Sequence, residues 1–462
     1  MFEPDVYIKR REQLIKSMSG GLVLLVGNSE SPMNYLDNTY PFRQDSTFLY
    51  YTGISRPDLF LIIDIESHHT ALVGHELTID DIIWSGSQPD LVNLGELCGA
   101  DQVLSSSELT TELEKARSQK RTIHYLSPYR AETKNRLEKL LGLSVEQHSK
   151  DNSFELASAV ITQRSVKEPR EVNEIEMALG ITQLMILAGM KSVQPGKYER
   201  EIAGLVEGIA ISGGGRLAYP CILTKHGEVL HNHQYHRRLD QGDLVVQDSG
   251  ASSIHGYASD ITRTYPVNGI FSSCQATIYL AVLRSLEGAL STIRPESSFK
   301  ESHLAAARII TDHLQQIGIM QGDIDESVAV GAHALFFPHG LGHMMGLDVH
   351  DMENLGEDFV GYNDQVHRSQ QFGLKSLRFG RAPSQGYVLT VEPGCYFITP
   401  LIDQWKNEKR HESFIRYDML SRWENFGGIR IEENILVTSD GCKILGPPIP
   451  KNIPDVENAC RG

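Results

Sequence analysis

The sequence lacks closely spaced cysteines. Its six cysteines are scattered along 462 residues, and none belongs to a C-x-x-C pair. Small disulfide-stabilised proteins and structural zinc sites both depend on paired cysteines. The pattern therefore argues against a disulfide framework and against a zinc site built from thiolates.

Long apolar runs are missing as well. The longest, LVLLV and LFLIIDI, fall far short of the ~20 residues that a membrane helix requires. The opening stretch MFEPDVYIKRREQL contains no apolar core of the kind found in signal peptides. We therefore expect no membrane partner and a cytoplasmic location.

Positive charge is scarce. The chain has 43 Lys and Arg against 59 Asp and Glu, for a net charge of −16. The longest basic run, YIKRRE, is interpreted as the solvated face of a helix. Because nucleic-acid affinity depends on basic surface, we expect no nucleic-acid partner.

The chain is too long for one compact core, since domains usually have ~100–200 residues. In the first third, short apolar runs that indicate strands alternate with helical patterns, and Gly142 is expected to end a helix. This predicts an α/β domain over 1–160. The remainder, 161–462, combines long amphipathic helices with alternating strand-like runs, which favours an α+β domain with antiparallel pairs.

Four acidic residues of the second domain stand in strand-like apolar runs: Asp248, Asp260, Glu392 and Glu432. A single acid in such a place is usually solvated or paired with a structural partner. Four are harder to accommodate, because burial in an apolar setting raises carboxyl pKa values unless a cation neutralises the group. Asp248 and Asp260 are expected to face each other on one hairpin.

The stretch HGLGHMMGLDVHD, residues 339–351, holds three histidines. Its glycines make a helix unlikely, so the spacing of His339 and His343 is not the H-E-x-x-H zinc motif. The segment LDVHD is expected to be a strand, with Leu347 and Val349 inward and with Asp348 and His350 on the opposite face. Asp348 and Asp351 are not expected to bind metal.

Four carboxylates and one imidazole suit Mn²⁺ or Co²⁺ better than a structural zinc ion. Two divalent cations would balance the four negative charges. Such a pair of metals can share a hydroxide nucleophile and polarise a carbonyl group.

These segments together resemble the pita-bread metallopeptidases, which include aminopeptidase P, prolidase and methionine aminopeptidase. The matching stretches are DSGA…YASDITRTYPVNG, FFPHGLGHMMGLDVHD, VLTVEPGCYF and GGIRIEENILVT, in the family's order within 190–450. In the first domain, YPFRQDSTFLYYTG resembles the N-terminal domain of aminopeptidase P and prolidase, which methionine aminopeptidases lack. The resemblance implies an α+β fold with a C-terminal pita-bread catalytic domain and a smaller N-terminal creatinase/prolidase-like α/β domain.

The resemblance also implies roles for individual residues. Asp260 and Glu432 would bridge two metal ions, Mn²⁺ with Co²⁺ or Zn²⁺ as alternatives. Glu392 would also carry protons, and His350 or His231 would donate to the developing oxyanion. The implied metal ligands are Asp248, Asp260, His343, Glu392 and Glu432; the other site residues are His231, His350 and Arg430 for catalysis and Tyr219, His339 and Arg378 for substrate.

Two features favour the prolidase branch, whose members hydrolyse Xaa-Pro dipeptides. The interval from Glu392 to Glu432 is long, as in prolidases. Arg378 aligns with the arginine that prolidases use for the substrate's terminal carboxylate, a group that guanidinium binds bidentately. If Arg378 were instead a surface residue of a basic loop, the alternative would be an Xaa-Pro aminopeptidase that acts on longer peptides.

Two further alternatives share the fold. A peptide-binding scaffold that has lost catalysis would also have lost metal ligands, and none is missing here. Creatinase-like chemistry does not use the metal carboxylates. The expected partners are therefore a small peptide with proline at its second position and a second copy of the chain, as a homodimer.

The sequence departs from the family pattern in two places. The Asp248–Asp260 hairpin is one residue longer than expected, and the extra residue must lie in the turn or in a bulge. The stretch LTKHGEVLHNHQYHRRL lacks the usual glycine-asparagine loop, although it retains His231. Its other histidines, His226, His233 and His236, are assigned no role and are expected at the surface.

Overall fold

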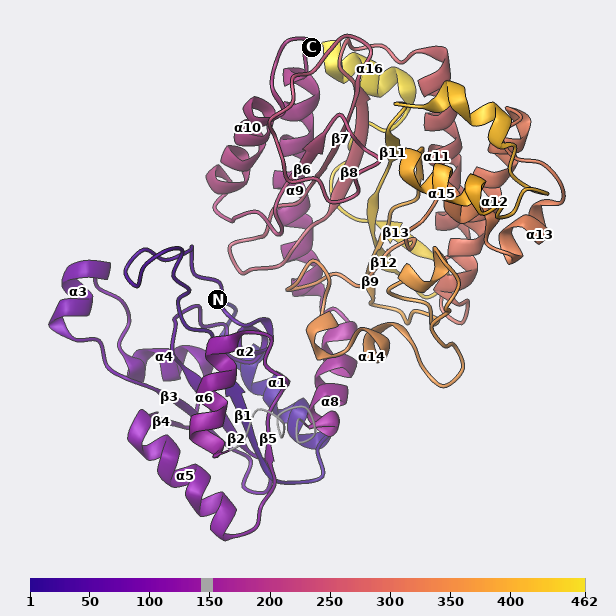
Figure 1. Ribbon diagram of the computed structural model, residues 1–462. Helices are drawn as coiled ribbons and strands as arrows, with labels where there is room; N and C mark the ends of the chain where they lie inside the picture. The colour runs from indigo at the N-terminus through magenta and orange to yellow at the C-terminus, as the bar shows by residue number, and fades with distance from the viewer. Residues whose placement is uncertain (143–152, 462) are drawn as a thin grey trace. The chain divides into compact units, whose positions relative to one another are not determined.

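The computed structural model describes residues 1–142 and 153–461. The chain forms two compact units, Met1–Arg164 and Ser165–Gly462 (Figure 1). Helix α8 (Phe154–Ser165) ends at the division between them.

The first unit is built on a mixed sheet in the order β4-β3-β2-β1-β5. Its central strands β1, β2 and β3 are antiparallel, while β4 and β5 pair in parallel with β3 and β1. The predicted strand runs of this domain, LVLLV, LFLIIDI, HTALVG and RTIHYL, contain β1, β2, β3 and β5; β4 was not predicted, because it is a four-residue strand in which only Leu104 is buried and its apolar signal is weak. The strands are β1 (Leu22–Val26), β2 (Phe60–Asp64), β3 (His69–Gly74), β4 (Gln102–Ser105) and β5 (Ile123–His124).

Helices pack their apolar residues onto this sheet. Leu109 and Leu113 of α5 and Leu137 of α6 join the buried core around Phe60 and Val73. Helix α6 ends at Gly142, which has a φ of 63° and so occupies the left-handed conformation predicted for this cap. The helices are α1 (Pro4–Lys16), α2 (Ser46–Thr52), α3 (Ile79–Ser85), α4 (Leu91–Cys98), α5 (Ser106–Ser118) and α6 (Ala131–Leu141).

The basic run in α1 is only partly a solvated face: Lys9 and Glu12 are exposed as predicted, but the prediction was wrong for the two arginines. Arg10 and Arg11 are each only 2% exposed. Arg10 donates to the Tyr50 carbonyl, and Arg11 donates to the carbonyls of Tyr51 and Cys98. These carbonyls lie in the last turns of α2 and α4, where helices leave acceptors unpaired and favour positive charge.

The second unit contains only antiparallel strand pairs within its described residues, as predicted. Three sheets form it, in the orders β6-β7-β8, β13-β12-β9 and β10-β11. The strands are β6 (Ile222–Thr224), β7 (Leu244–Ser249), β8 (Ile261–Pro266), β9 (Val388–Val391), β10 (Gly394–Tyr396), β11 (Gly428–Arg430), β12 (Glu433–Val437) and β13 (Cys442–Ile444).

Two pairs of long helices cover these sheets (Figure 1). Helices α9 (Pro169–Ser192) and α10 (Glu199–Ser212) pack on each other and contact β7 and β6. Helices α11 (Ser273–Thr292) and α12 (Phe299–Gln316) pack together, and α11 contacts β9, β10 and β11. The shorter helices are α13 (Ile324–Ala329), α14 (Glu357–Gly361), α15 (Thr399–Asn407), α16 (Ile453–Arg461) and four 3₁₀ turns, η1 (Ala332–Leu335), η2 (Glu353–Leu355), η3 (Leu374–Ser376) and η4 (Tyr417–Trp423).

The segment LDVHD is a series of bends and not the predicted strand. The Gly346 amide donates to the Asp348 carbonyl, and the Asp348 amide donates to the Asp351 carboxylate. Such local hydrogen bonds compete with strand pairing. Val349 and His350 consequently line the same pocket, although the strand model placed them on opposite faces.

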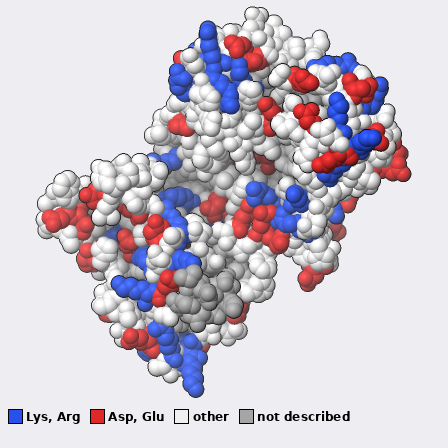
Figure 2. All heavy atoms as spheres, viewed as in Figure 1, with Lys and Arg blue, Asp and Glu red and all other residues white. Residues whose placement is uncertain are grey.

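On the face drawn in Figure 2, acidic and basic side chains are interspersed over the surface. Across residues 1–142 and 153–461, no helix is both long enough and apolar enough to span a bilayer.

Candidate metal centre and active site

The β7–β8 hairpin brings its two aspartates onto one face. Asp248 pairs with Thr262, and Asp260 lies two residues before Thr262 and so shares its face. The ladder keeps the same register as far as the bridge between Ser252 and Ala258. The hairpin therefore has no bulge in this stretch, and the additional residue lies in the turn 253–257.

Three backbone segments carry the other predicted ligands to this face. The His343 amide donates to the Thr390 hydroxyl on β9, which places residues 339–343 beside that strand. The Glu392 amide donates to the Leu341 carbonyl. Glu432 lies between β11 and β12, where its amide donates to the Thr262 carbonyl.

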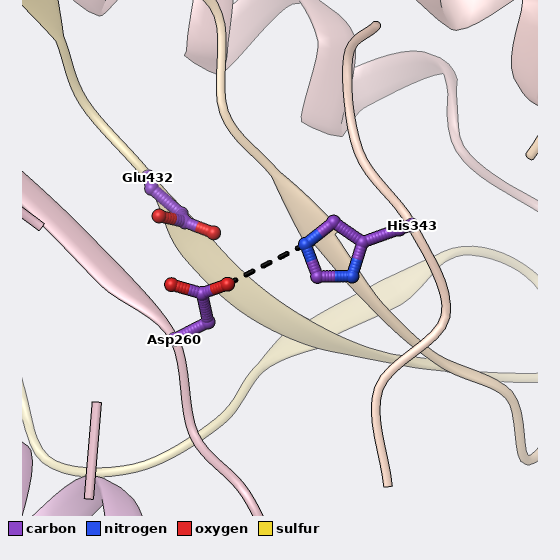
Figure 3. A group of neighbouring side chains, drawn as sticks. All are labelled: Asp260, His343 and Glu432. Atoms are coloured by element: carbon purple, nitrogen blue, oxygen red, sulfur yellow. Dashed lines mark ion pairs between the residues drawn. The ribbon is translucent and has the colours of Figure 1, made fainter. Parts of the chain in front are cut away.

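Asp260, His343 and Glu432 form a compact buried group (Figure 3). One ligand atom from each lies within 4.8 Å of the others. His343 Nε2 lies 3.4 Å from Asp260 Oδ2 and 3.8 Å from Glu392 Oε1. Glu392 thus contacts the group through the imidazole.

The charges of this group fit a bound cation. Burial raises the pKa of Glu392 to about 7, and burial with the charge of Asp260 raises the pKa of Glu432 well above its usual value. Glu432 Oε1 is buried without a hydrogen-bond partner among the described residues. Buried oxygens in an acidic cluster call for a neutralising partner, so these residues fit divalent metal ions.

His343 is held between the acids. Burial opposes its charged form, yet Asp260 and Glu392 raise the pKa of His343 to about 9. The same histidine offsets the effect of burial on Asp260 and lowers the pKa of that carboxyl. A ligand set of this kind releases a proton when a metal binds, since coordinating imidazole must be neutral.

Asp248 faces different partners. Arg430 Nη2 donates to Asp248 Oδ2 at 2.6 Å, and the Tyr219 hydroxyl donates to Asp248 Oδ1 at 2.6 Å. The Tyr219 hydroxyl also contacts Asp260 Oδ1. Burial raises the pKa of Asp248 despite the nearby Arg430 charge. Tyr219 and Arg430 therefore fix both aspartates of the hairpin.

All of the predicted site residues line one cavity of about 410 Å³. Apolar walls accompany them, among them Ile222, Leu230 and Val349. His233 also lines this cavity, and it is exposed, as predicted; its Nδ1 lies 3.4 Å from the Cys221 carbonyl. A half-apolar cavity with converging polar groups is the usual form of a small-molecule site.

The cavity histidines differ in their partners. His339 Nε2 lies 2.8 Å from the Tyr396 hydroxyl, and burial lowers the pKa of His339 to about 3, which keeps it neutral. His350 Nδ1 lies 3.4 Å from Glu353 Oε2. Burial also lowers the pKa values of His350 and His231.

Several supporting residues escaped prediction. The Thr262 hydroxyl donates to Glu432 Oε2 and accepts from Arg430 Nε. Arg430 Nη1 donates to the Tyr396 hydroxyl. Asn434 holds the Asp260 backbone through its amide and carbonyl groups. Period-2 spacing from Asp260 and Glu432 would have identified Thr262 and Asn434 as neighbours of the site.

Comparison with known proteins identifies the families that both parts of the chain match. The family model of metallopeptidase family M24 matches residues 173–439, and that of the aminopeptidase P N-terminal domain matches residues 7–124. The Xaa-Pro dipeptidase of Homo sapiens is 31% identical, over 96% of this chain and 89% of its own length. The Xaa-Pro aminopeptidase of Escherichia coli strain K12 is 30% identical, over 97% of this chain and 96% of its own.

Solved structures of aminopeptidase P are similar to this chain over its whole length. Zinc-substituted E. coli aminopeptidase P in complex with product has a TM-score of 0.81 at 29% identity, covering 100% of this chain and 98% of that one. The same enzyme with the inhibitor Pro-Leu gives the same values. The predicted fold, a C-terminal pita-bread domain preceded in the sequence by a smaller α/β domain, is confirmed. The chain is a metal-dependent peptidase and belongs to metallopeptidase family M24.

Proposed function

We propose that the protein hydrolyses the bond between an N-terminal residue and proline in Xaa-Pro dipeptides. The observation that carries this proposal is the convergence of the five metal-ligand candidates and Arg378 on one cavity. The names of the human and E. coli relatives support an Xaa-Pro substrate.

Asp248, Asp260, His343, Glu392 and Glu432 are the residues that would hold the metals. Two bound divalent ions would supply an activated water and polarise the scissile carbonyl. We propose Mn²⁺ in this role, with Co²⁺ or Zn²⁺ as alternatives, because the ligand set is rich in carboxylate oxygen.

Glu392 is proposed to carry the proton. Its Oε1 faces His343, which leaves Oε2 to take a proton from the attacking water and pass it to the proline nitrogen as that atom leaves. A pKa of about 7, caused by burial, suits a group that must both accept and release a proton near neutral pH.

The remaining cavity residues are proposed to position the substrate. His350 or His231 donates a hydrogen bond to the developing oxyanion, a contact that strengthens as charge accumulates. His339, kept neutral by burial, lies on the substrate side. Tyr219 and Arg430 hold Asp248 in place, and Tyr219 does so at the cavity wall.

Arg378 is proposed to bind the terminal carboxylate, which would select dipeptides. One observation favours the alternative, an Xaa-Pro aminopeptidase that acts on longer peptides: the E. coli relative, 30% identical over 97% of this chain, bears that name. The two activities differ in whether substrate extends past proline.

A substrate panel tests the proposal. The purified protein with added Mn²⁺ should hydrolyse Ala-Pro faster than Ala-Pro-Ala. Efficient cleavage of the tripeptide alone would establish the aminopeptidase alternative. If neither peptide is hydrolysed and elemental analysis finds no bound divalent ion, the protein is not an enzyme of this type.

Three further assignments belong to the proposal. The domains are taken as 1–160 and 161–462, with the catalytic machinery in the second. The assembly is proposed to be a homodimer, which light scattering tests directly. Cytoplasmic residence is proposed because the six cysteines are scattered and do not form the close pairs of a disulfide framework, and cell fractionation tests it.

A further inference from the structure

Glu353, at the start of η2, contacts two residues of the cavity wall. Its Oε2 lies 2.6 Å from Arg378 Nη1 and 3.4 Å from His350 Nδ1. The Glu353 side chain is only 15% exposed, whereas those of Arg378 and His350 are each 35% exposed. One largely buried carboxylate oxygen thus links the arginine proposed for substrate binding with a histidine proposed for catalysis.

The contact uses only one nitrogen of the guanidinium group. Glu353 and Glu357 both contact Arg378 through Nη1, at 2.6 and 3.4 Å. Arginine binds a carboxylate through two parallel N–H groups. Anchoring by Nη1 leaves the edge formed by Nε and Nη2 for a ligand, and neither of these atoms has a hydrogen-bond partner among the described residues.

The same contact orients His350. With Nδ1 toward Glu353, the opposite ring nitrogen, Nε2, is the one left for other partners, and His350 lines the cavity. A carboxylate that accepts from one imidazole nitrogen fixes the ring's rotation and its tautomer.

We propose that Glu353 is a positioning residue that holds Arg378 ready for the carboxylate of proline in an Xaa-Pro dipeptide. This inference rests on the proposed function. An unanchored arginine samples many rotamers, so fixing one end of the guanidinium group reduces the entropy lost when the substrate binds. By fixing Arg378, Glu353 therefore favours the binding of dipeptides that end in a free carboxylate.

The neighbouring acids provide graded controls. Glu357 contacts Arg378 only at the longer distance and also pairs with Arg368. Asp358, on the same helix α14, pairs with Arg368 and is 68% exposed. Asp358→Ala removes a nearby carboxylate that contacts neither Arg378 nor His350.

The test compares a free dipeptide with its amide. We would measure kcat and KM on Ala-Pro and Ala-Pro-NH₂ for the wild type and for Glu353→Ala, Glu353→Asp, Glu353→Gln and Asp358→Ala. Glu353→Ala should raise KM for Ala-Pro about tenfold and leave KM for the amide nearly unchanged, since a lost charged hydrogen bond is worth about this factor. Asp358→Ala should match the wild type.

The conservative variants separate positioning from charge. Glu353→Gln retains an acceptor for Nη1 and should keep most of the preference for the free acid. Glu353→Asp keeps the charge but shortens the side chain, so it should lose part of the preference. It also keeps the proposal testable if the alanine variant fails to fold.

Three results would overturn the proposal. An unchanged ratio of kcat/KM between acid and amide in both Glu353→Ala and Glu353→Asp would show that Glu353 does not position Arg378. A lower KM for Ala-Pro in Glu353→Ala would show that it competes with the substrate. A wild type that hydrolyses Ala-Pro and its amide without preference would also refute this inference, but Xaa-Pro hydrolysis would still be the function. If the protein hydrolysed none of Ala-Pro, Ala-Pro-NH₂ and Ala-Pro-Ala, the proposed function itself would be refuted.

Discussion

At the scale of single residues, Glu432 is the most informative ligand candidate. Its Oε2 accepts from Thr262, and its Oε1 is buried without a partner among the described residues. Glu432→Gln is nearly isosteric but removes the charge, so we expect the variant to fold and to lose at least one metal ion with most of its activity. Elemental analysis and circular dichroism check this, and full metal occupancy in the variant would contradict it.

A second residue-scale feature is the pair His303 and His333, which lies outside the proposed site. Their rings are 6.3 Å apart, both are fully buried, and none of their four ring nitrogens has a hydrogen-bond partner among the described residues. Burial lowers the pKa of His333 to about 4 and lowers the pKa of His303 well below its usual value.

This pair should make the protein sensitive to acid. In the unfolded chain each histidine takes up a proton near pH 6.5, whereas in the folded chain it does not, so stability falls as pH drops below 6.5. For His333 alone we expect a loss of about 2 kcal/mol at pH 5. Urea unfolding at pH 7 and pH 5 measures it; His333→Phe should reduce the pH dependence, and a change at exposed His367 should not.

The four acidic metal-ligand candidates could be predicted from sequence because each stands out locally, as an acid inside an apolar run. Their supporting partners could not. Glu353 lies in a polar stretch where nothing marks it, and its importance depends on Arg378, 25 positions away, folding back beside it. The position of His233 at the cavity could not be predicted for the same reason, because nothing in the sequence distinguishes it from its neighbours.

At the scale of elements, a buried ion pair joins the start of α9 to the segment that carries His350. Lys167 Nζ lies 2.9 Å from Asp351 Oδ2, and each side chain is 1% exposed. Asp351→Ala would leave a buried ammonium group without this partner, and we expect a loss of about 3–5 kcal/mol in unfolding free energy. The double variant Lys167→Met with Asp351→Leu should recover part of that loss.

A double-mutant cycle from denaturant unfolding measures this coupling. If the single Asp351→Ala variant loses less than about 1 kcal/mol, the pair does not anchor the segment, since exposed pairs contribute at that level. Asp325→Ala removes an exposed partner of Arg308 and serves as the control. It should change stability only slightly.

Most elements could be predicted because their signals are periodic and long. The alternation in β8 and the amphipathic pattern of α9 are of this kind. The predictions failed at β4 and at LDVHD. These segments have only four or five residues, so tertiary contacts or local hydrogen bonds determine their backbone conformation more strongly than the sequence pattern does. The buried Arg10 and Arg11 show that charge pattern alone does not reveal burial when helix ends supply acceptors.

At the scale of the whole molecule, the proposed ligands connect segments from most of the second unit. Asp248 and Asp260 belong to the β7–β8 hairpin, His343 lies beside β9, Glu392 precedes β10, and Glu432 joins β11 to β12. The unfolded chain does not hold these groups together. Metal should therefore bind mainly to the folded second unit, and each bound ion stabilises that unit by mass action.

Removal of metal should consequently lower the melting temperature of the second unit and leave the first unchanged. At a free metal concentration about 100-fold above Kd each bound ion stabilises the unit by about 2.7 kcal/mol, which for a unit of this size corresponds to a shift of about 4 °C. Differential scanning calorimetry of the full chain, after chelation and after Mn²⁺ is restored, measures it. Asp260→Asn should melt at the same temperature under both conditions. If the melting temperatures of the wild type also did not change with Mn²⁺, these carboxylates would not form a metal centre. A metal that binds only the folded state must stabilise that state.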